Sequence, residues 1–397
     1  MSAASVLLEH ARVVRDDGVV ARSLAFSGGS VVEAAQSELT IDLRDHLIFP
    51  GLINAHDHLQ LNAIPGLEHD QPFANSYDWI DAFESHRRRP EIAAAAAVAK
   101  TTRYQHGGLK NLLAGATTVA HHDPWDETFD SPDFPVRVVR RYGWCHSLRL
   151  GGRRDGVPPR YGPEVCASYA STASDAPWII HLAEGTDSVA SSELSALDAM
   201  GCLASNTVIV HGAGLTKSDI DSVIGRGAAV VWCPSSNVGM LGRTLDPHRL
   251  ASAGRVALGT DSRLTGSRDI LEELRTAAKQ SDLSHRELLR LVTTDAARVL
   301  RLPAPRLEPE SAGDCLILHA THDPYETLLA ARRADIRAVV RGGVPMIADP
   351  DFAGWFARCG VDTRAVVLDG RPKLLSASLA RPDVIAVEPG LSESRNA

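Results

Sequence analysis

The stretch that decides the fold of this chain reads Phe49-Pro50-Gly51-Leu52-Ile53-Asn54-Ala55-His56-Asp57-His58. It has a Pro-Gly start and the apolar run of a buried β-strand, and it ends in two histidines spaced one residue apart. Side chains at positions i and i+2 of a strand point to the same face, so His56 and His58 can reach a single point. Two imidazoles that converge at the carboxyl end of a strand are half of a zinc-type site.

Three later strand-like runs also end in residues that bind metals or transfer protons. The run from Trp178 ends in His181 and brings a carboxylate, Glu184, three residues later. The runs Val208-Ile209-Val210-His211 and Val256-Ala257-Leu258-Gly259-Thr260-Asp261 end in a histidine and an aspartate. Taken singly, each could be structural, for example Glu184 as an acidic residue at a helix start. Four such strand ends in this order favour one shared site.

Together these stretches resemble the metal-dependent amidohydrolase superfamily, and the His-x-x-Glu element resembles its deaminase and chlorohydrolase branch, which includes cytosine and guanine deaminases. The resemblance implies one divalent ion held by His56, His58, His181 and Asp261. It also implies that Glu184 shuttles protons and that His211 contacts the attacking hydroxide or the substrate.

The expected cofactor is one zinc ion, because no lysine stands at a strand end where it could bridge two ions. Imidazole and carboxylate ligands suit zinc, and they leave iron and manganese as alternatives. A bound divalent ion lowers the pKa of water from about 16 towards about 7, which makes hydroxide available at neutral pH. Asp261 would accept the proton, Glu184 would protonate a ring nitrogen, and His211 would stabilise the oxyanion.

Four further polar residues are candidate substrate contacts: Gln60, His122, Arg149 and Asn237. Gln60 lies just past the metal pair, and either His121 or His122 must face the barrel interior. Asn237 ends a Cys-Pro-Ser-Ser-Asn turn that resembles one of this branch, although its side chain could equally satisfy local backbone. Arg149 precedes an arginine-rich loop, and the alternative to a substrate contact is that its charge is solvated.

Residues 49–304 alternate strand-like and helix-like segments, which predicts an α/β fold with a TIM-type (β/α)8 barrel. The strand signals lie at Ala116–His121, Trp178–His181, Thr207–His211, Ala228–Cys233 and Val256–Leu258. The helix signals lie at Glu91–Gly115, Ser267–Lys279 and Ser284–Leu302. Residues 1–48 and 305–397 carry short β-type runs, and the resemblance implies one small discontinuous β-sandwich domain with a C-terminal tail. The last ten residues are expected to be disordered.

One barrel strand is hard to find between His122 and His181. Only Gly143–Leu150 has a strand-like pattern in this interval, where a full barrel needs two strands. Either a strand is hidden in Gly151–Pro163 or the barrel is trimmed between its second and fifth strands. We expect a distorted eight-stranded barrel.

Composition and charge narrow the class of partner. The 397-residue chain has a net charge of -8 and no Lys/Arg run suited to phosphates, which argues against nucleic acid. It has no 18-residue apolar run and no secretion signal in residues 1–25, and its six cysteines are scattered. We therefore expect a cytoplasmic protein with a small-molecule substrate and no membrane partner. Dimers are common in the family that this chain resembles, which makes a homodimer a candidate for its oligomeric state.

The leading hypothesis is a hydrolase of non-peptide C–N bonds that deaminates a purine, pyrimidine, pterin or triazine-like ring. Alternatives within the family are ring opening of a cyclic amide or amidine, as in imidazolone hydrolysis, and hydrolytic removal of halide. A barrel that only binds a ligand is the alternative from another class. The presence of both metal ligands and a proton shuttle counts against it.

Overall fold

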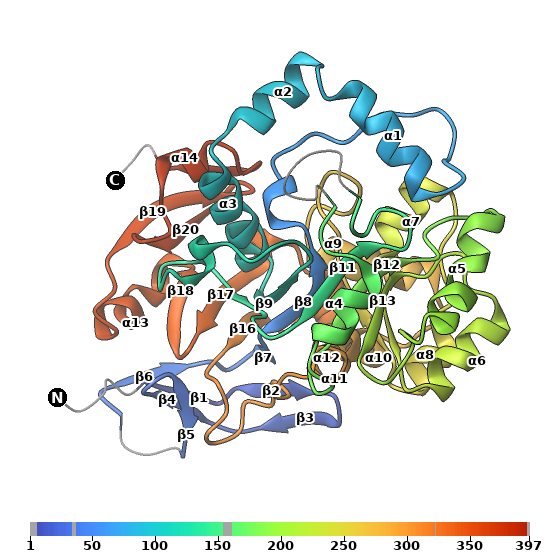
Figure 1. Cartoon of the computed structure of the whole chain (residues 1–397). Coiled ribbons are helices and arrows are strands. Elements are labelled where there is room, and N and C mark those ends of the chain that lie inside the picture. Colours follow the sequence, from blue (N-terminus) through green and yellow to red (C-terminus); the bar gives the residue numbers. More distant parts are fainter. Residues whose placement is uncertain (1–5, 34–36, 154–160, 322, 395–397) are drawn as a thin grey trace.

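The centre of the molecule holds parallel β-strands surrounded by helices (Figure 1). The structure is a computed structural model that describes residues 6–33, 37–153, 161–321 and 323–394. A three-stranded sheet has the order β10-β9-β8, and a five-stranded sheet has the order β11-β12-β13-β14-β15, which makes eight strands. Their bounds are β8 Leu52–Asp57, β9 Ala116–His121, β10 Arg137–Val138, β11 Gly143–Ser147, β12 Trp178–Leu182, β13 Thr207–His211, β14 Ala229–Trp232 and β15 Val256–Leu258.

Two hydrogen bonds join the two parallel sheets, one between the edge strands β15 and β8 and one from just after the middle strand β9 to the edge strand β11. On one side the Asp261 N–H, just after β15, donates to the carbonyl oxygen of His56 in β8 at 3.1 Å. On the other side His122 Nε2, just after β9, lies 3.0 Å from the carbonyl oxygen of Cys145 in β11. The carboxyl ends of β8, β9, β11 and β15 are therefore close together in space.

Both faces of β8, β12, β13, β14 and β15 are buried, as the apolar runs predict for parallel sheets. Ile179 and Val208 belong to one hydrophobic cluster, which also includes residues of α11. Their neighbours Ile180 and Ile209 belong to a second cluster that includes residues of several other helices. The period of two along each strand thus places successive side chains in two different clusters.

Five predicted strands agree with the structure to within one residue, whereas Gly143–Leu150 is shorter and ends at Ser147, and two predicted helices are interrupted. Glu91–Gly115 divides at Val98 and Ala99, whose ψ values of 134° and 135° are extended. Ser284–Leu302 divides near Thr293 into α10 and α11. The helices are α1 Ser76–His86, α2 Pro90–Ala97, α3 Lys100–Leu113, α4 Val165–Ser171, α5 Ser188–Ala199, α6 Lys217–Gly225, α7 Pro234–Leu241, α8 His248–Ser252, α9 Ile270–Gln280, α10 His285–Leu291, α11 Thr294–Val299, α12 Pro324–Ala330, α13 Ala353–Arg358 and α14 Pro382–Ile385.

Helices α1 and α2 form an arm that extends over one end of the strands (Figure 1). Asn75 caps α1, since its side chain accepts hydrogen bonds from the first N–H groups of the helix. The Ser76 N–H donates to the carbonyl oxygen of Glu184 at 2.9 Å, and Tyr77 Oη donates to Glu193 Oε1 at 2.5 Å. The start of the arm is therefore fixed to the segment that follows β12.

The two ends of the chain share a nine-stranded sheet, ordered β21-β19-β20-β18-β17-β16-β7-β2-β3. A four-stranded sheet, β5-β4-β1-β6, packs on it through a common core that includes Phe26, Ile317 and Trp355. The strands are β1 Val6–Glu9, β2 Arg12–Arg15, β3 Gly18–Ala21, β4 Leu24–Ser27, β5 Ser30–Val32, β6 Leu39–Asp42, β7 His46–Pro50, β16 Cys315–His319, β17 Ile336–Arg341, β18 Val344–Ala348, β19 Thr363–Leu368, β20 Arg371–Ser376 and β21 Leu391–Glu393.

Two expectations about the chain need correction. The additional strand between His122 and His181 is β10, which has only two residues and lies before Gly143. No strand occurs in the described parts of Gly151–Pro163, and residues 154–160 lie outside the described residues. Residues 388–394 are ordered, not disordered, because β21 pairs with β19 and Glu388 is buried among basic side chains. None of the described helices is long and apolar enough to cross a membrane.

Candidate active site

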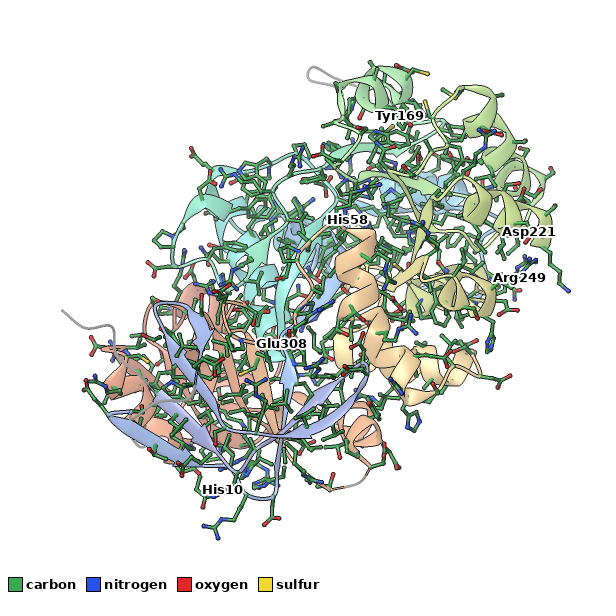
Figure 2. All side chains as sticks on the ribbon, turned by 90° about the horizontal axis from the view of Figure 1, so that it is seen from below. His10, His58, Tyr169, Asp221, Arg249 and Glu308 are labelled. Atoms are coloured by element: carbon green, nitrogen blue, oxygen red, sulfur yellow. The ribbon has the colours of Figure 1, made fainter. Side chains whose placement is uncertain are left out.

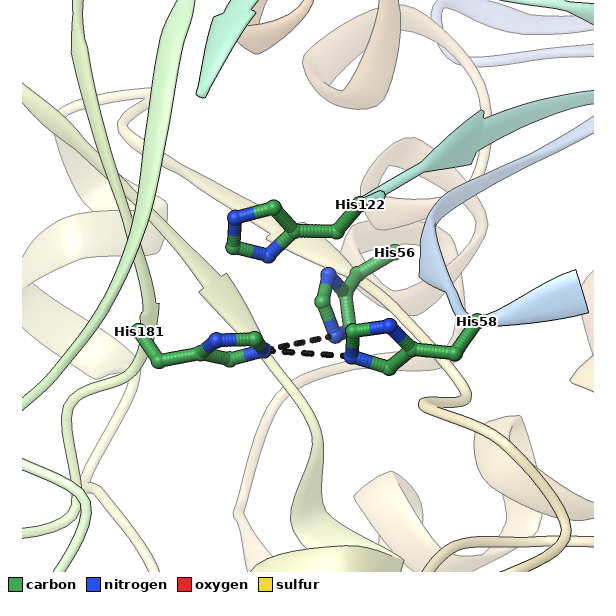
Figure 3. Close-up of side chains that lie close together, drawn as sticks. All are labelled: His56, His58, His122 and His181. Carbon is green, nitrogen blue, oxygen red and sulfur yellow. Dashed lines mark hydrogen bonds between the residues drawn. The ribbon is translucent and has the colours of Figure 1, made fainter. Parts of the chain in front are cut away.

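Three imidazoles converge at the carboxyl ends of β8 and β12 (Figure 3). His181 Nε2 lies 3.3 Å from His58 Nε2 and 3.4 Å from His56 Nε2. All three side chains are buried or nearly so, with residue exposures of 1% to 9%. They lie in the parallel-strand part of the molecule, and Figure 2 shows His58 well away from His10 in the sheets of the chain ends.

Hydrogen bonds on the far side of two rings fix which nitrogen carries the proton. His58 Nδ1 lies 2.7 Å from Asp123 Oδ2, and His181 Nδ1 lies 2.9 Å from the carbonyl oxygen of His146. Both partners are acceptors, so each Nδ1 carries hydrogen, and in the neutral form of either ring the Nε2 lone pair points at the centre of the cluster. Acceptor partners of this kind are typical of histidines that bind metals.

Burial controls the charge of these rings. It lowers the pKa of His56 to about 4 and the pKa of His181 well below its usual value, which keeps both imidazoles neutral at pH 7. Burial also acts to lower the pKa of His58, but the nearby Asp123 carboxylate overcomes it and raises that pKa to about 9.

Asp261 brings a carboxylate to the same point. Its Oδ1 lies 3.7 Å from His56 Nε2 and 3.8 Å from His58 Nε2, while its Oδ2 accepts from Ser236 Oγ at 2.8 Å. The backbone at Asp261 has a φ of 54°, a left-handed conformation that side-chain-bearing residues seldom adopt. Residues held in this way are concentrated at functional sites.

The donor set fits a divalent cation. Nitrogen ligands at the corners of a tetrahedron around zinc, each about 2.0–2.1 Å from it, lie about 3.3 Å apart, and His181 Nε2 has this spacing from the Nε2 atoms of both His56 and His58. Asp261 Oδ1, 3.7 Å from His56 Nε2, offers a fourth oxygen or nitrogen donor to an ion at this point.

Glu184 and His211 lie beside this cluster. His211 Nε2 is 3.3 Å from Glu184 Oε1, and His211 Nδ1 is 2.9 Å from Asn237 Oδ1. Burial raises the pKa of Glu184, although the nearby His211 partly opposes that shift. A carboxyl group with a raised pKa near neutral imidazoles is suited to accepting and returning a proton.

His122, and not His121, faces the cluster. The rings of His122 and His181 stack with their centroids 4.2 Å apart, and one nitrogen of His122 lies within 4.8 Å of those of the other three histidines. Its Nδ1 is buried without a hydrogen-bond partner among the described residues. His121 instead packs against Tyr104 and Phe129.

A pocket of about 480 Å³ opens onto this cluster. Gln60 lines it, as do His58, Glu184 and Asp261, and Gln60 Nε2 donates to Asp123 Oδ2 at 2.7 Å. Apolar side chains of the α1–α2 arm and its surroundings line the opposite wall, namely Leu61, Ile64, Trp79, Ile80, Phe83, Ile92, Met240 and Leu264.

The other three candidate substrate contacts, His122, Asn237 and Arg149, are not among the residues that line this pocket. Asn237 is fully buried behind His211 and orients that ring. The exposed Arg149 lies over the ring of Tyr77, with its Cζ 5.6 Å from the ring centroid, and lines a neighbouring depression. Direct contact of any of the three with substrate stays a prediction.

Sequence reasoning missed Asp123 and His146. Asp123 was visible only as part of His121-His122-Asp123, and no local pattern pairs it with His58 sixty-five residues earlier. His146 lines the pocket from β11, and its ring centroid lies 5.0 Å from that of His181. The signal that could have found His146 is its position at the end of a strand, as for the predicted residues.

Comparison with known proteins shows the family to which the chain belongs. Residues 161–370 match the sequence model of the Amidohydrolase family. The chain is 23% identical to a 5-methylthioadenosine/S-adenosylhomocysteine deaminase of Pyrococcus furiosus, over 86% of this chain and 92% of the relative. A deaminase of the same name from Nitratidesulfovibrio vulgaris is 28% identical over 66% of this chain and 68% of the relative.

Solved structures share the fold. An adenosine deaminase from Xanthomonas campestris with bound zinc superposes with a TM-score of 0.69 at 21% identity, covering 90% of this chain and 97% of that one. An atrazine chlorohydrolase from Arthrobacter aurescens complexed with zinc has a TM-score of 0.70 at 19% identity, covering 86% and 95%.

Proposed function

The chain belongs to the amidohydrolase family, and from this premise we propose that it hydrolytically deaminates a nitrogen heterocycle. The observation that carries the proposal is the position of Glu184, which lies 3.3 Å from His211 in the pocket that opens onto the cluster of His56, His58, His181 and Asp261. We call these four residues the metal-type cluster. A site that only bound a ligand would need no buried carboxyl group suited to proton transfer. Deaminases are prominent among the relatives, which supports the same activity.

We propose that one zinc ion is held by His56, His58, His181 and Asp261. The spacing of the three Nε2 atoms and the neutral state of His56 and His181 support this set. Two structural neighbours are described with zinc, while iron and manganese suit the same ligands. When bound, such an ion lowers the pKa of water and polarises an acceptor atom of the substrate.

The side chains around the ion divide the proton chemistry between them. Asp261 Oδ2 accepts from Ser236 Oγ at 2.8 Å and Thr265 Oγ1 at 2.6 Å, so the carboxylate is held where it can receive a proton. Glu184 carries a proton to a ring nitrogen or to the departing amine, as its raised pKa favours. His211, oriented by Asn237, donates or accepts at the oxygen added to the ring.

We further infer that the eight parallel strands form a single distorted (β/α)8 barrel, with residues 49–304 as its domain. The hydrogen bonds that join β15 to β8 and β9 to β11 support closure. Residues 1–48 and 305–397 then form one discontinuous β-sandwich domain, supported by the core that their two sheets share.

The test is ammonia release by the zinc-loaded full chain from amino-substituted purines, pyrimidines, pterins and triazines. Chloride release from the matching chloro-substituted rings, and ring opening of cyclic amides, are measured in parallel. Deamination of at least one amino compound, lost in Glu184→Gln with zinc retained, is the expected result. Chloride release or ring opening without any deamination would assign one of the alternative reactions instead.

A further inference from the structure

Arg103, at the start of α3, is a partly buried cation that lines the pocket. Its Nε donates to the carbonyl oxygen of Val98 at 3.1 Å, and its Nη1 donates to that of Gln60 at 2.9 Å. These two bonds fix the plane of the guanidinium group. The remaining donors, including both on Nη2, have no partner among the residues that the structure describes.

The charge of Arg103 also has no counterion among the described residues. Other charged groups of the pocket are paired, since Arg87 Nη1 lies 3.1 Å from Glu84 and His58 Nδ1 lies 2.7 Å from Asp123. Burial lowers the pKa of Arg103, but a guanidinium group remains protonated at any physiological pH. A partly buried charge without a counterion is less favourable than a paired one, and an anionic ligand would supply the counterion.

An apolar wall accompanies this cation. The rings of Trp79 and Phe83 in α1 are stacked, with centroids 5.3 Å apart and an interplanar angle of 8°. They pack with Ile64, Ile92 and Leu264, and all five side chains line the pocket. The pocket therefore combines a hydrolytic site, an apolar wall and one unpaired cation.

We propose that the substrate is a heterocycle whose apolar arm ends in an anionic oxyacid group, and that Arg103 binds this group. A guanidinium edge can donate two parallel hydrogen bonds to a carboxylate or a phosphate, so both anions share the required chemistry. The apolar arm would lie against Trp79 and Phe83. The inference rests on the proposed function, because the heterocycle is the part that the metal-type cluster would receive.

The test uses matched ligands of purine, pyrimidine, pteridine and triazine rings that lack an exocyclic amino group, so that no turnover occurs. Each ring carries an alkyl arm, and three versions of each ligand are compared, in which the arm ends in a carboxylate, a phosphonate or a neutral carboxamide. Their affinities for the zinc-loaded full chain are measured by titration calorimetry. For at least one ring, an anionic ligand should bind about 10- to 100-fold more tightly than its carboxamide, as expected for hydrogen bonds to charged groups.

Two variants test whether Arg103 causes the tighter binding of anionic ligands than of the carboxamide. Arg103→Gln should reduce the preference to less than about threefold, with zinc content unchanged. Arg341→Gln is the matched control, because Arg341 also donates to two carbonyl oxygens, those of Phe134 and Pro132, and burial likewise lowers its pKa, but it does not line the pocket. The control should keep the full preference, and comparison of carboxylate with phosphonate identifies which anion is preferred.

The inference is overturned if no ring shows a preference for an anionic ligand. It is also overturned if the preference persists in Arg103→Gln, since the anion then binds elsewhere, for example at the metal. Deamination of neutral heterocycles without any anion preference refutes this inference and leaves the proposed function intact. A clear anion preference without deamination of any amino heterocycle refutes the proposed function and leaves Arg103 as an anion-binding residue.

Discussion

Asp123→Asn tests how the metal centre is held, because it removes one charge and almost no volume. Asp123 Oδ2 lies 2.7 Å from His58 Nδ1 and 2.7 Å from Gln60 Nε2, so one oxygen serves both partners. The Asp123 side chain is only 22% exposed, and solvent therefore replaces it poorly. An asparagine oxygen can still accept a hydrogen bond, but it does not enrich the electron density of His58 as a carboxylate does.

The expected loss is about 10- to 100-fold in zinc affinity, which corresponds to about 1.4–2.7 kcal/mol. Competition of the purified protein with a zinc-binding dye at fixed pH measures it directly. Asp126→Asn is the control, because this nearby aspartate caps a short helical turn and contacts none of the cluster histidines. Wild-type zinc affinity in Asp123→Asn, or an equal loss in the control, would refute the positioning role of Asp123.

Three further changes test other parts of the molecule. Glu184→Gln should lower kcat about 100- to 10,000-fold while zinc content stays at the wild-type level, and loss of zinc would make Glu184 a ligand instead. Burial raises the pKa of Glu273 to about 7, so the folded chain holds a proton that the unfolded chain releases above about pH 4.5, and stability should fall as pH rises from 5 to 7. Melting curves of Glu273→Gln should show a weaker fall across this interval than wild type, and an identical pH dependence would contradict the assignment. Glu388→Gln should lower the free energy of unfolding by about 3 kcal/mol, since it breaks a buried cluster with Arg263 and Arg333; chemical denaturation measures this, and a change below about 1 kcal/mol would contradict it.

The convergence of the metal-type cluster and of His211 could be predicted from sequence because each of these residues lies at the end of a strongly patterned strand. His56, His181, His211 and Asp261 all follow runs that are buried on both faces, and such runs are distinctive even without an alignment. The carboxyl ends of parallel strands meet at one end of the sheet, so order along the chain was enough to bring these residues together.

Short or irregular elements gave no comparable signal. Strand β10 has two residues, fewer than one full alternation of buried and exposed side chains, and so has no period to detect. The end of the chain is polar and contains proline, which is typical of disorder. Glu388 is nevertheless buried, because Arg263, Arg333 and His106 come from three distant segments to surround it. Long-range pairing of this kind has no local sequence pattern.

The same distinction explains why reaction class could be predicted from sequence while substrate could not. Residues that hold an ion must converge on one point, and that requirement selects both residue type and strand register. The residue types of the pocket wall are constrained only by the shape and chemistry of the ligand. The arm that supplies Trp79, Phe83 and Ile92 has the sequence pattern of ordinary surface helices. The Glu91–Gly115 pattern predicted one continuous helix, yet the break at Val98 and Ala99 is what separates the arm from α3 and leaves Arg103 facing the pocket. If Arg103 binds the substrate as proposed, specificity depends on this two-residue interruption, and ligand discrimination at Arg103 is a more direct route to the substrate than any further strand-end motif.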